Sequence, residues 1–251
     1  MAEFLLIDNS NSFTKFALAS RSAVGASRKL PTPEVNATSV RKTLGTWKFQ
    51  AVVLCSVVPE KAGILERTLD SIPCERVSAH SPLGIRIDYP KPATIGADRL
   101  ANACAAAALY GAPSIVVDFG TAVSFDILAG GDTYVGGVIA PGLEAMTDYL
   151  HHRTALLPKI KLLEPPDAIG KSTKHAMLAG AVYGYRGMVR EILAQIQKSL
   201  RLRRAPRVVA TGGYADLIAS GLPEISQIHP GLTLEGLRLI ATRAFPTTPS
   251  R

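Results

Sequence analysis

The chain opens on an apolar run, a polar turn and a second apolar run, FLLIDNSNSFTKFALAS at residues 4–20. Apolar residues lead into Asp8, small polar residues follow, and Lys15 begins the returning segment. Such a pattern predicts a β-hairpin whose tip carries a carboxylate. We therefore expect the chain to place an acidic, polar turn within its first structural element.

Later apolar patterns predict an alternation of strands and helices. AVVLCSVVP (51–59) is continuously apolar, which is typical of a strand buried on both faces. Helical patterns cover 61–72, 96–111 and 172–200, and a second hairpin covers 114–129. Residues 133–146 read as a strand, a glycine-rich turn and a helix, and residues 207–221 as a strand, a Gly-Gly turn and the start of a helix. This order predicts an α/β protein.

The two hairpin segments resemble each other. IDNSNSFTKFAL (7–18) aligns with VDFGTAVSFDIL (117–128), so that Asp8 matches Asp118, with an offset of 110 residues. An offset near half the chain length suggests a duplicated domain with a cleft between the copies. We expect one domain over residues 1–117 and a second over 118–251.

Composition narrows the class of protein. The 251 residues are 47% hydrophobic and 19% charged, as in packed globular proteins, and no apolar run is long enough for a transmembrane helix. The N-terminus lacks the basic leader and apolar core of a signal peptide. Three cysteines without a CxxC pair favour free thiols in a reducing cytoplasm.

The net charge of +8 favours anionic ligands in general. Much of the excess lies in QKSLRLRRAPR (197–207), where Lys198, Arg201, Arg203, Arg204 and Arg207 gather. No aromatic residue is interleaved for base stacking. We therefore expect a solvated surface there and no nucleic-acid partner.

An acidic hairpin tip suits nucleotide phosphates when a cation lies between them. Turns of small residues expose backbone N–H groups that bind phosphate, and Mg²⁺ bridges phosphate and carboxylate oxygens. Lys15 could reach a terminal phosphate as a point charge. The alternative for this turn alone is an Asx-type turn that caps itself. The second hairpin, and the TGG turn at 211–213 after a buried strand, favour the nucleotide site.

A P-loop is excluded. GKST (170–173) looks like the end of that motif, but Pro165 stands where its first glycine should be.

GADR (96–99) places Asp98 and Arg99 at the start of an Ala-rich helix. Asp98 could orient a hydroxyl and accept its proton as that hydroxyl attacks phosphorus. Arg99 could bind a carboxylate through two hydrogen bonds. The alternative is an acidic residue favoured by the helix dipole beside a surface arginine.

Together these segments resemble the type III pantothenate kinases of the acetate and sugar kinase/Hsp70/actin superfamily. DNSNSFTK (8–15) is similar to the family's first phosphate motif, GADR to its substrate motif, and DFGTA (118–122) to its second phosphate motif. GGVIAPG (136–142), GKST and TGG follow in the family's order. The resemblance covers most of the chain and implies two RNase H-like, actin-like ATPase domains.

The resemblance also implies an activity and a set of roles. The protein would transfer the γ-phosphoryl group of ATP to pantothenate, giving 4'-phosphopantothenate in the first step of coenzyme A synthesis. Asp98 would be the base, Asp118 would hold K⁺ or NH₄⁺, and the family works as a homodimer. The first loop would face Mg–ATP with Asp8, Asn9, Ser10, Asn11, Ser12, Phe13, Thr14 and Lys15, and Thr121 would touch ATP. The pantothenate pocket would be lined by Tyr89, Gly96, Ala97, Asp98, Arg99 and Thr173.

The first loop departs from the family motif, because Ser10 replaces a glycine and Ser12 a threonine. A positive φ at Ser10 would strain the loop by about 1–3 kcal/mol and could weaken ATP binding. This departure leaves two alternatives open: a kinase-like regulator of the transcriptional accessory type, and another small-molecule kinase or phosphatase on the same fold.

Overall fold

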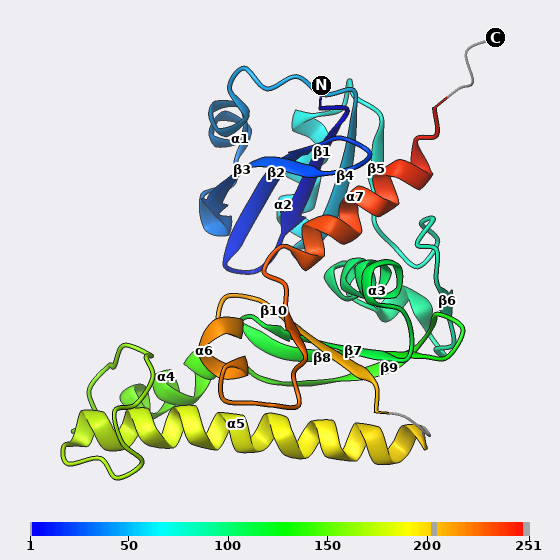
Figure 1. Cartoon of the computed structure of the whole chain (residues 1–251). Coiled ribbons are helices and arrows are strands. Elements are labelled where there is room, and N and C mark those ends of the chain that lie inside the picture. The colour runs from blue at the N-terminus through cyan, green and yellow to red at the C-terminus, as the bar shows by residue number, and fades with distance from the viewer. Residues whose placement is uncertain (1, 202–204, 248–251) are drawn as a thin grey trace. The chain divides into compact units, whose positions relative to one another are not determined.

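The computed structural model describes residues 2–201 and 205–247, which form two compact units coloured along the chain in Figure 1. Unit 1 holds residues up to 111, residues 131–135 and the segment from 231 onward. Unit 2 holds 112–130 and the segment from 136 to 230. Arg203 and Arg204 of the basic segment lie outside the described residues.

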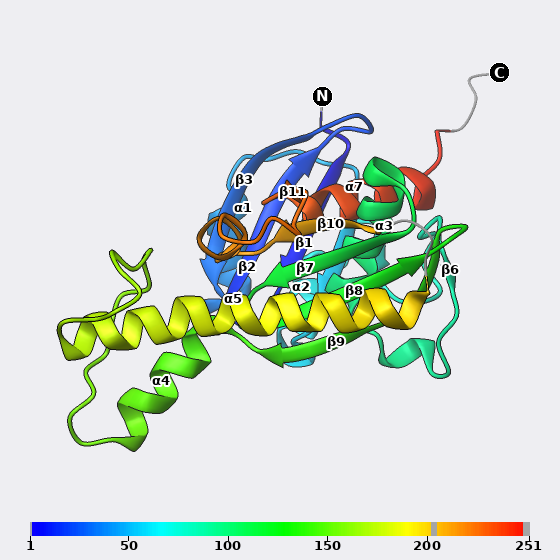
Figure 2. The ribbon, with the colours of Figure 1, turned by 60° about the horizontal axis from the view of Figure 1, so that its bottom comes forward.

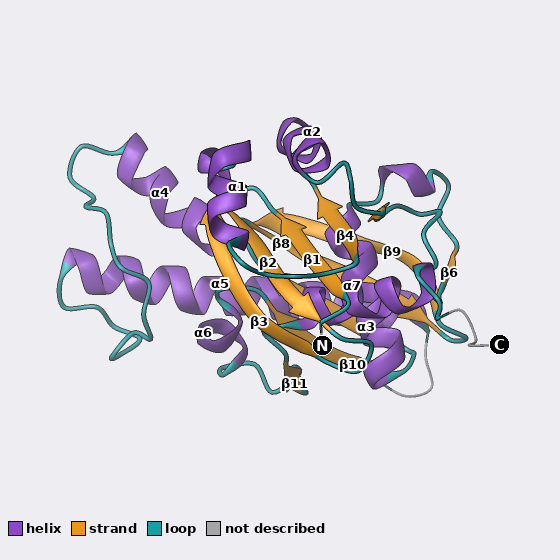
Figure 3. Cartoon of the chain, turned by 90° about the horizontal axis from the view of Figure 1, so that it is seen from above, coloured by secondary structure: helices purple, strands orange, loops and turns teal. Residues whose placement is uncertain are grey.

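Unit 1 is built on a five-stranded sheet in the order β3-β2-β1-β4-β5. Its strands are β1 (Phe4–Asn9), β2 (Phe13–Ala19), β3 (Val24–Pro31), β4 (Ala51–Ser56) and β5 (Cys74–Arg76). Its helices are α1 (Ala37–Leu44), α2 (Pro59–Thr68), α3 (Ala97–Tyr110) and α7 (Leu232–Ala244). Leu5 and Ile7 of β1 pack against α1 and α2, which lie on one side of the strands in Figure 3.

Unit 2 repeats this strand order. The strands β7 (Ser114–Phe119), β8 (Ala122–Ala129), β9 (Thr133–Pro141), β10 (Arg207–Thr211) and β11 (Gln227–Ile228) are arranged β11-β10-β7-β8-β9. Its helices are α4 (Leu143–Arg153), α5 (Thr173–Leu200) and α6 (Ala215–Ala219). Figure 2 shows α5 along the sheet, and its buried side chains join those of β7, β8 and β10 in one core. The shared order is the internal repeat expected from the sequence.

The hairpins of the repeat differ by one residue in their turns. Asp8 pairs with Lys15 in the first hairpin, whereas Asp118 pairs with Ser124 in the second. The first turn is therefore one residue longer, although both carboxylates lie at the end of the first strand of their hairpin.

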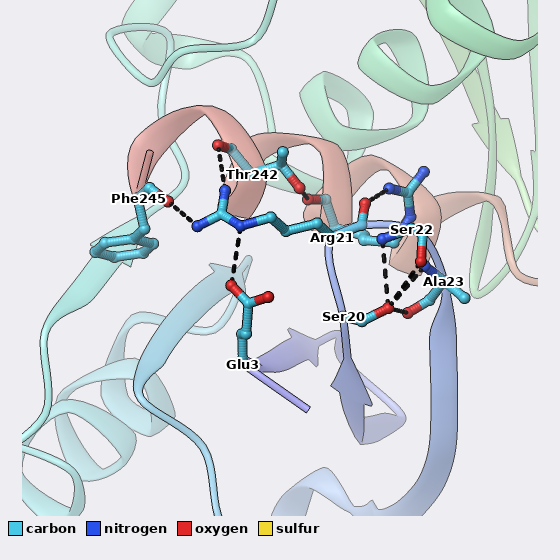
Figure 4. Close-up of polar contacts among 8 residues, drawn as sticks. Glu3, Ser20, Arg21, Ser22, Ala23, Thr242 and Phe245 are labelled. Carbon is cyan, nitrogen blue, oxygen red and sulfur yellow. Dashed lines mark hydrogen bonds and ion pairs between the residues drawn. The ribbon is translucent and has the colours of Figure 1, made fainter. Parts of the chain in front are cut away.

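The C-terminal helix α7 belongs to unit 1, a division that differs from the expected boundary between residues 117 and 118. α7 packs on α3, where a Cβ on Gly236 would lie 2.0 Å from the Ala101 carbonyl oxygen. Arg21, after β2, binds the carbonyl oxygens of Thr242 and Phe245 and pairs with Glu3 at 2.9 Å (Figure 4). The last helix thus closes the first unit instead of the second.

The strands and helices expected from the sequence are present, with one exception in the position of a turn. Gly136 and Gly137, expected in a turn, lie within β9, where Gly136 has φ 135. The chain turns instead at Gly142, directly before α4. The short strand β6 (Arg86–Ile87) pairs with the start of β9 in unit 1. Among the described helices, none has the length and apolar character needed to cross a membrane.

Candidate active site

The carboxylate of Asp8 is held at the tip of the first hairpin. Asp8 is the fifth residue of β1 and only 3% exposed. The Ser10 hydroxyl donates a hydrogen bond to its Oδ1 over 2.8 Å, and the Lys15 Nζ lies 3.4 Å from its Oδ2. The two oxygens therefore have different partners, one neutral and one cationic.

A buried hydrogen-bond network supports this turn. The Asn9 amide donates to the Thr14 hydroxyl at 2.7 Å, and Thr14 lies 3.0 Å from the Thr32 hydroxyl. Thr32 in turn donates to the carbonyl oxygen of Ser10 at 2.6 Å, and Ser56 donates to Asn9 at 2.6 Å. Sequence analysis missed Thr32 and Ser56, because nothing local shows that distant residues meet under the turn.

The loop is not strained at Ser10. Among the described residues, only Asp132 and Arg201 have a positive φ without being glycine. The condition for strain at Ser10, a positive φ, is therefore not met. The Cβ of Ser10 fits an ordinary backbone conformation, and its hydroxyl binds the neighbouring carboxylate.

Replacing Ser10 by glycine should lower the free energy of unfolding by about 1 kcal/mol, because the variant loses a hydrogen bond and gains freedom in the unfolded chain. Urea unfolding of both proteins measures this difference. Ser12→Gly in the same turn is the matched control. A Ser10→Gly protein more stable than the parent would restore the strain argument.

Asp98 lies in the first turn of α3, two residues after the N-cap Gly96. The backbone N–H of Arg99 donates to its Oδ1 at 2.8 Å. Burial raises the pKa of the Asp98 carboxyl; the Arg99 N–H opposes this rise, and the negative charge of Asp8 adds to it. Asp8 and Asp98, 90 positions apart, are thus close enough in unit 1 to interact electrostatically. A raised pKa makes Asp98 a better proton acceptor than an ordinary aspartate.

Arg99 and Tyr89 meet at a tyrosine that sequence analysis missed. Tyr134, at the start of β9, is fully buried. The Arg99 guanidinium lies 5.9 Å from the centre of its ring, and the Tyr89 ring meets it edge-on at 6.4 Å. In the sequence, Tyr134 is marked only as part of the strand that leads into the GGVIAPG segment. Its contacts with Tyr89 and Arg99 could not be predicted from that.

In unit 2, the second hairpin is packed closely by two glycines of the other motifs. A Cβ on Gly142 would lie 2.2 Å from the Thr121 carbonyl oxygen, and a Cβ on Gly212 would lie 2.5 Å from the Asp118 carboxylate. Tyr214 donates its N–H to the Phe119 carbonyl oxygen at 3.2 Å. The structure therefore joins three sequence-predicted motifs, DFGTA, GGVIAPG and TGG, around Asp118 and Thr121.

The predicted site residues fall on both units. Unit 1 holds the first loop together with Tyr89 and residues 96–99, whereas unit 2 holds Asp118, Thr121 and Thr173. Thr173 is exposed and begins α5, whose N-cap Ser172 accepts a hydrogen bond from the His175 N–H. Within the first loop, Asn11, Ser12, Phe13 and Lys15 are exposed and Asn9 and Thr14 are buried.

The oxygen donors suit the cations expected here. No cluster of three or more acidic, histidine or cysteine residues that could hold a metal ion exists among the described residues. A single carboxylate such as that of Asp8 fits Mg²⁺ that arrives with nucleotide phosphates and keeps several waters. Asp118 supplies carboxylate oxygens at the end of β7, and oxygen atoms are suitable ligands for K⁺.

Comparison with known proteins gives a consistent result. A family model described as type III pantothenate kinase matches residues 4–195. The chain is 53% identical over 239 residues to the type III pantothenate kinase of Akkermansia muciniphila, covering 95% of this chain and 98% of the relative. It is 43% identical over 236 residues to that of Methylacidiphilum infernorum, covering 94% and 87%.

Solved structures share the fold at low identity. A Campylobacter jejuni structure named as a Baf family transcriptional activator has a TM-score of 0.63 at 19% identity, covering 96% of this chain and 98% of that chain. MreB 5 of Spiroplasma citri bound to AMPPNP has a TM-score of 0.53 at 11% identity, covering 96% of each chain. These likenesses show an actin-like ATPase fold and carry no further argument about activity.

Proposed function

This chain belongs to the type III pantothenate kinase family, and we propose that it phosphorylates pantothenate with ATP using Asp98 as the base. The product is 4'-phosphopantothenate, the first intermediate toward coenzyme A. The observation that carries the assignment of Asp98 is its raised pKa, caused by burial, at a helix start beside Asp8. The same motif holds Arg99, a cation suited to the carboxylate of pantothenate.

The chemistry asks the protein mainly for positioning and charge neutralisation. Asp98 orients the terminal hydroxyl of pantothenate and accepts its proton as the oxygen attacks the γ-phosphorus. The other lining residues of this pocket are Tyr89, Gly96, Ala97, Arg99 and Thr173. Because the hydroxyl proton leaves late in a loose transition state, an aspartate whose pKa is raised by burial is sufficient.

The first loop binds the nucleotide. Asp8 faces Mg–ATP, Lys15 adds positive charge near the terminal phosphates, and exposed backbone N–H groups of the turn donate hydrogen bonds to phosphate oxygens. Mg²⁺ supplies neutralisation of the charge on the phosphates when it is bound with ATP. The residues that take part are Asp8, Asn9, Ser10, Asn11, Ser12, Phe13, Thr14 and Lys15, joined by Thr121 of the second loop.

Asp118 holds the monovalent cation, K⁺ or NH₄⁺, in this proposal. Its carboxylate lies at the end of β7, where Gly212 leaves room for it. A cation bound there would supply positive charge near the nucleotide, in the way that a lysine or arginine side chain would.

A homodimer in the cytoplasm completes the proposal. Most of the large apolar side chains that are exposed belong to unit 2. They lie in β9, α4, the loop after α4 and α5, and they are Ile139, Met146, Tyr149, Leu150, Leu156, Leu163, Ile169 and Tyr183. Exposed apolar side chains that form one patch are typical of a protein–protein interface, and the proposal places these residues at the contact between subunits. Their neighbour Thr173 would then lie at or near the contact between subunits.

The activity is tested by measuring ADP release from ATP with purified protein and Mg²⁺. The release should require pantothenate and should fall strongly when Na⁺ replaces K⁺ and NH₄⁺. ADP release that is unaffected by omitting pantothenate would contradict the substrate, and equal rates in Na⁺ and K⁺ would contradict the cation. Light scattering of the eluted protein in the same buffer gives its oligomeric state.

A further inference from the structure

Tyr134 contacts two segments that are proposed to line the pantothenate pocket, one at Tyr89 and one at Arg99. Its backbone carbonyl accepts a hydrogen bond from the Asp88 N–H at 2.9 Å, next to Tyr89. Its ring contacts Tyr89 on one side and the guanidinium of Arg99 on another. With 0% exposure, Tyr134 is fully buried. All four residues lie in unit 1.

The ring can orient a cation without cancelling its charge. A guanidinium within about 6 Å of a ring centre is attracted by the negative face of the ring. The contact at 5.9 Å therefore helps to orient the guanidinium of Arg99.

We propose that Tyr134 is a specificity-determining positioning residue, which holds Arg99 so that the pocket prefers acceptors bearing a carboxylate. The inference rests on the proposed function. Arg99 binds the substrate carboxylate, and Tyr134 acts through Arg99 without touching the reacting atoms.

The test compares two rings of similar size at position 134. Phenylalanine keeps the negative ring face, whereas pentafluorophenylalanine removes it. The measured quantity is the ratio of kcat/KM for pantothenate to that for the neutral analogue in which a primary alcohol replaces the carboxylate. Tyr134→Phe should keep the wild-type ratio within about twofold, and the fluorinated variant should lower it by about three- to tenfold, as expected for a lost cation–π contact. The KM for ATP should stay unchanged in both.

A matched control uses Phe4, whose ring also lies under an arginine, Arg21, at 5.4 Å. Pentafluorophenylalanine at position 4 should leave the ratio unchanged. Equal ratios in the Phe and pentafluorophenylalanine variants at 134, or an equal fall for both acceptors, would overturn the inference alone. A wild-type protein that phosphorylates neither acceptor would overturn the proposed function and this inference with it.

Discussion

Replacing Asp98 by asparagine should lower kcat by at least about 100-fold, the usual contribution of a general base. The thermal unfolding temperature should stay the same or rise. Burial raises the pKa of Asp98 in the folded protein, so the charged form destabilises the fold at pH values above that pKa. Asparagine has no charge to bury. ADP release and circular dichroism at neutral pH measure the two effects.

The control is Asp70→Asn, because Asp70 is an exposed aspartate of the same unit. That variant should keep both activity and unfolding temperature. In the wild-type protein, kcat should fall on the acid side at a pH above the ordinary titration range of aspartate, since protonated Asp98 cannot accept the hydroxyl proton. An Asp98→Asn enzyme within tenfold of the wild-type rate would contradict the role of this residue.

Replacing Gly212 by alanine should destabilise unit 2 by at least about 2 kcal/mol, from backbone strain and overpacking together. Gly212 has φ 92, and its Cβ would lie 2.5 Å from the Asp118 carboxylate and 2.6 Å from the Phe119 backbone. The variant should also lose most of its activity, because Asp118 must move. Denaturant unfolding and ADP release measure the two effects.

Gly213 provides the matched control, since a Cβ there would meet nothing within 4 Å. Gly213→Ala should leave the unfolding midpoint nearly unchanged. If it still weakens ATP binding, the nucleotide approaches the backbone at Gly213, as the TGG motif suggests. Equal unfolding midpoints for the two alanine variants would show that the crowding at Gly212 has been overestimated.

Local patterns predicted the parts of the fold that depend on neighbouring residues. The hairpins around Asp8 and Asp118, the helix that begins at Ala97 and the long helix from Thr173 all followed from apolar periodicity and turn residues. The repeat predicted a duplicated sheet, and the strand orders agree with that expectation.

Long-range contacts could not be predicted in the same way. Helix α7 joins unit 1 because Gly236 lets it approach α3, and no local pattern shows which partner a C-terminal helix chooses. Thr32, Ser56 and Tyr134 support the site from segments without a motif. Gly136 was expected in a turn, but a glycine with positive φ also fits inside a strand.

The central claim is that Asp98 accepts the proton of the acceptor hydroxyl, whereas Asp8 faces Mg–ATP and Asp118 holds the monovalent cation. A crystal structure of the protein with pantothenate, Mg²⁺, K⁺ and a non-hydrolysable ATP analogue measures this directly. We expect an Asp98 carboxylate oxygen within about 3.2 Å of the terminal hydroxyl of pantothenate. Asp8 and Asp118 should both face the phosphates in that complex. Pantothenate bound with its hydroxyl away from Asp98, or the three carboxylates on unrelated faces, would contradict the account.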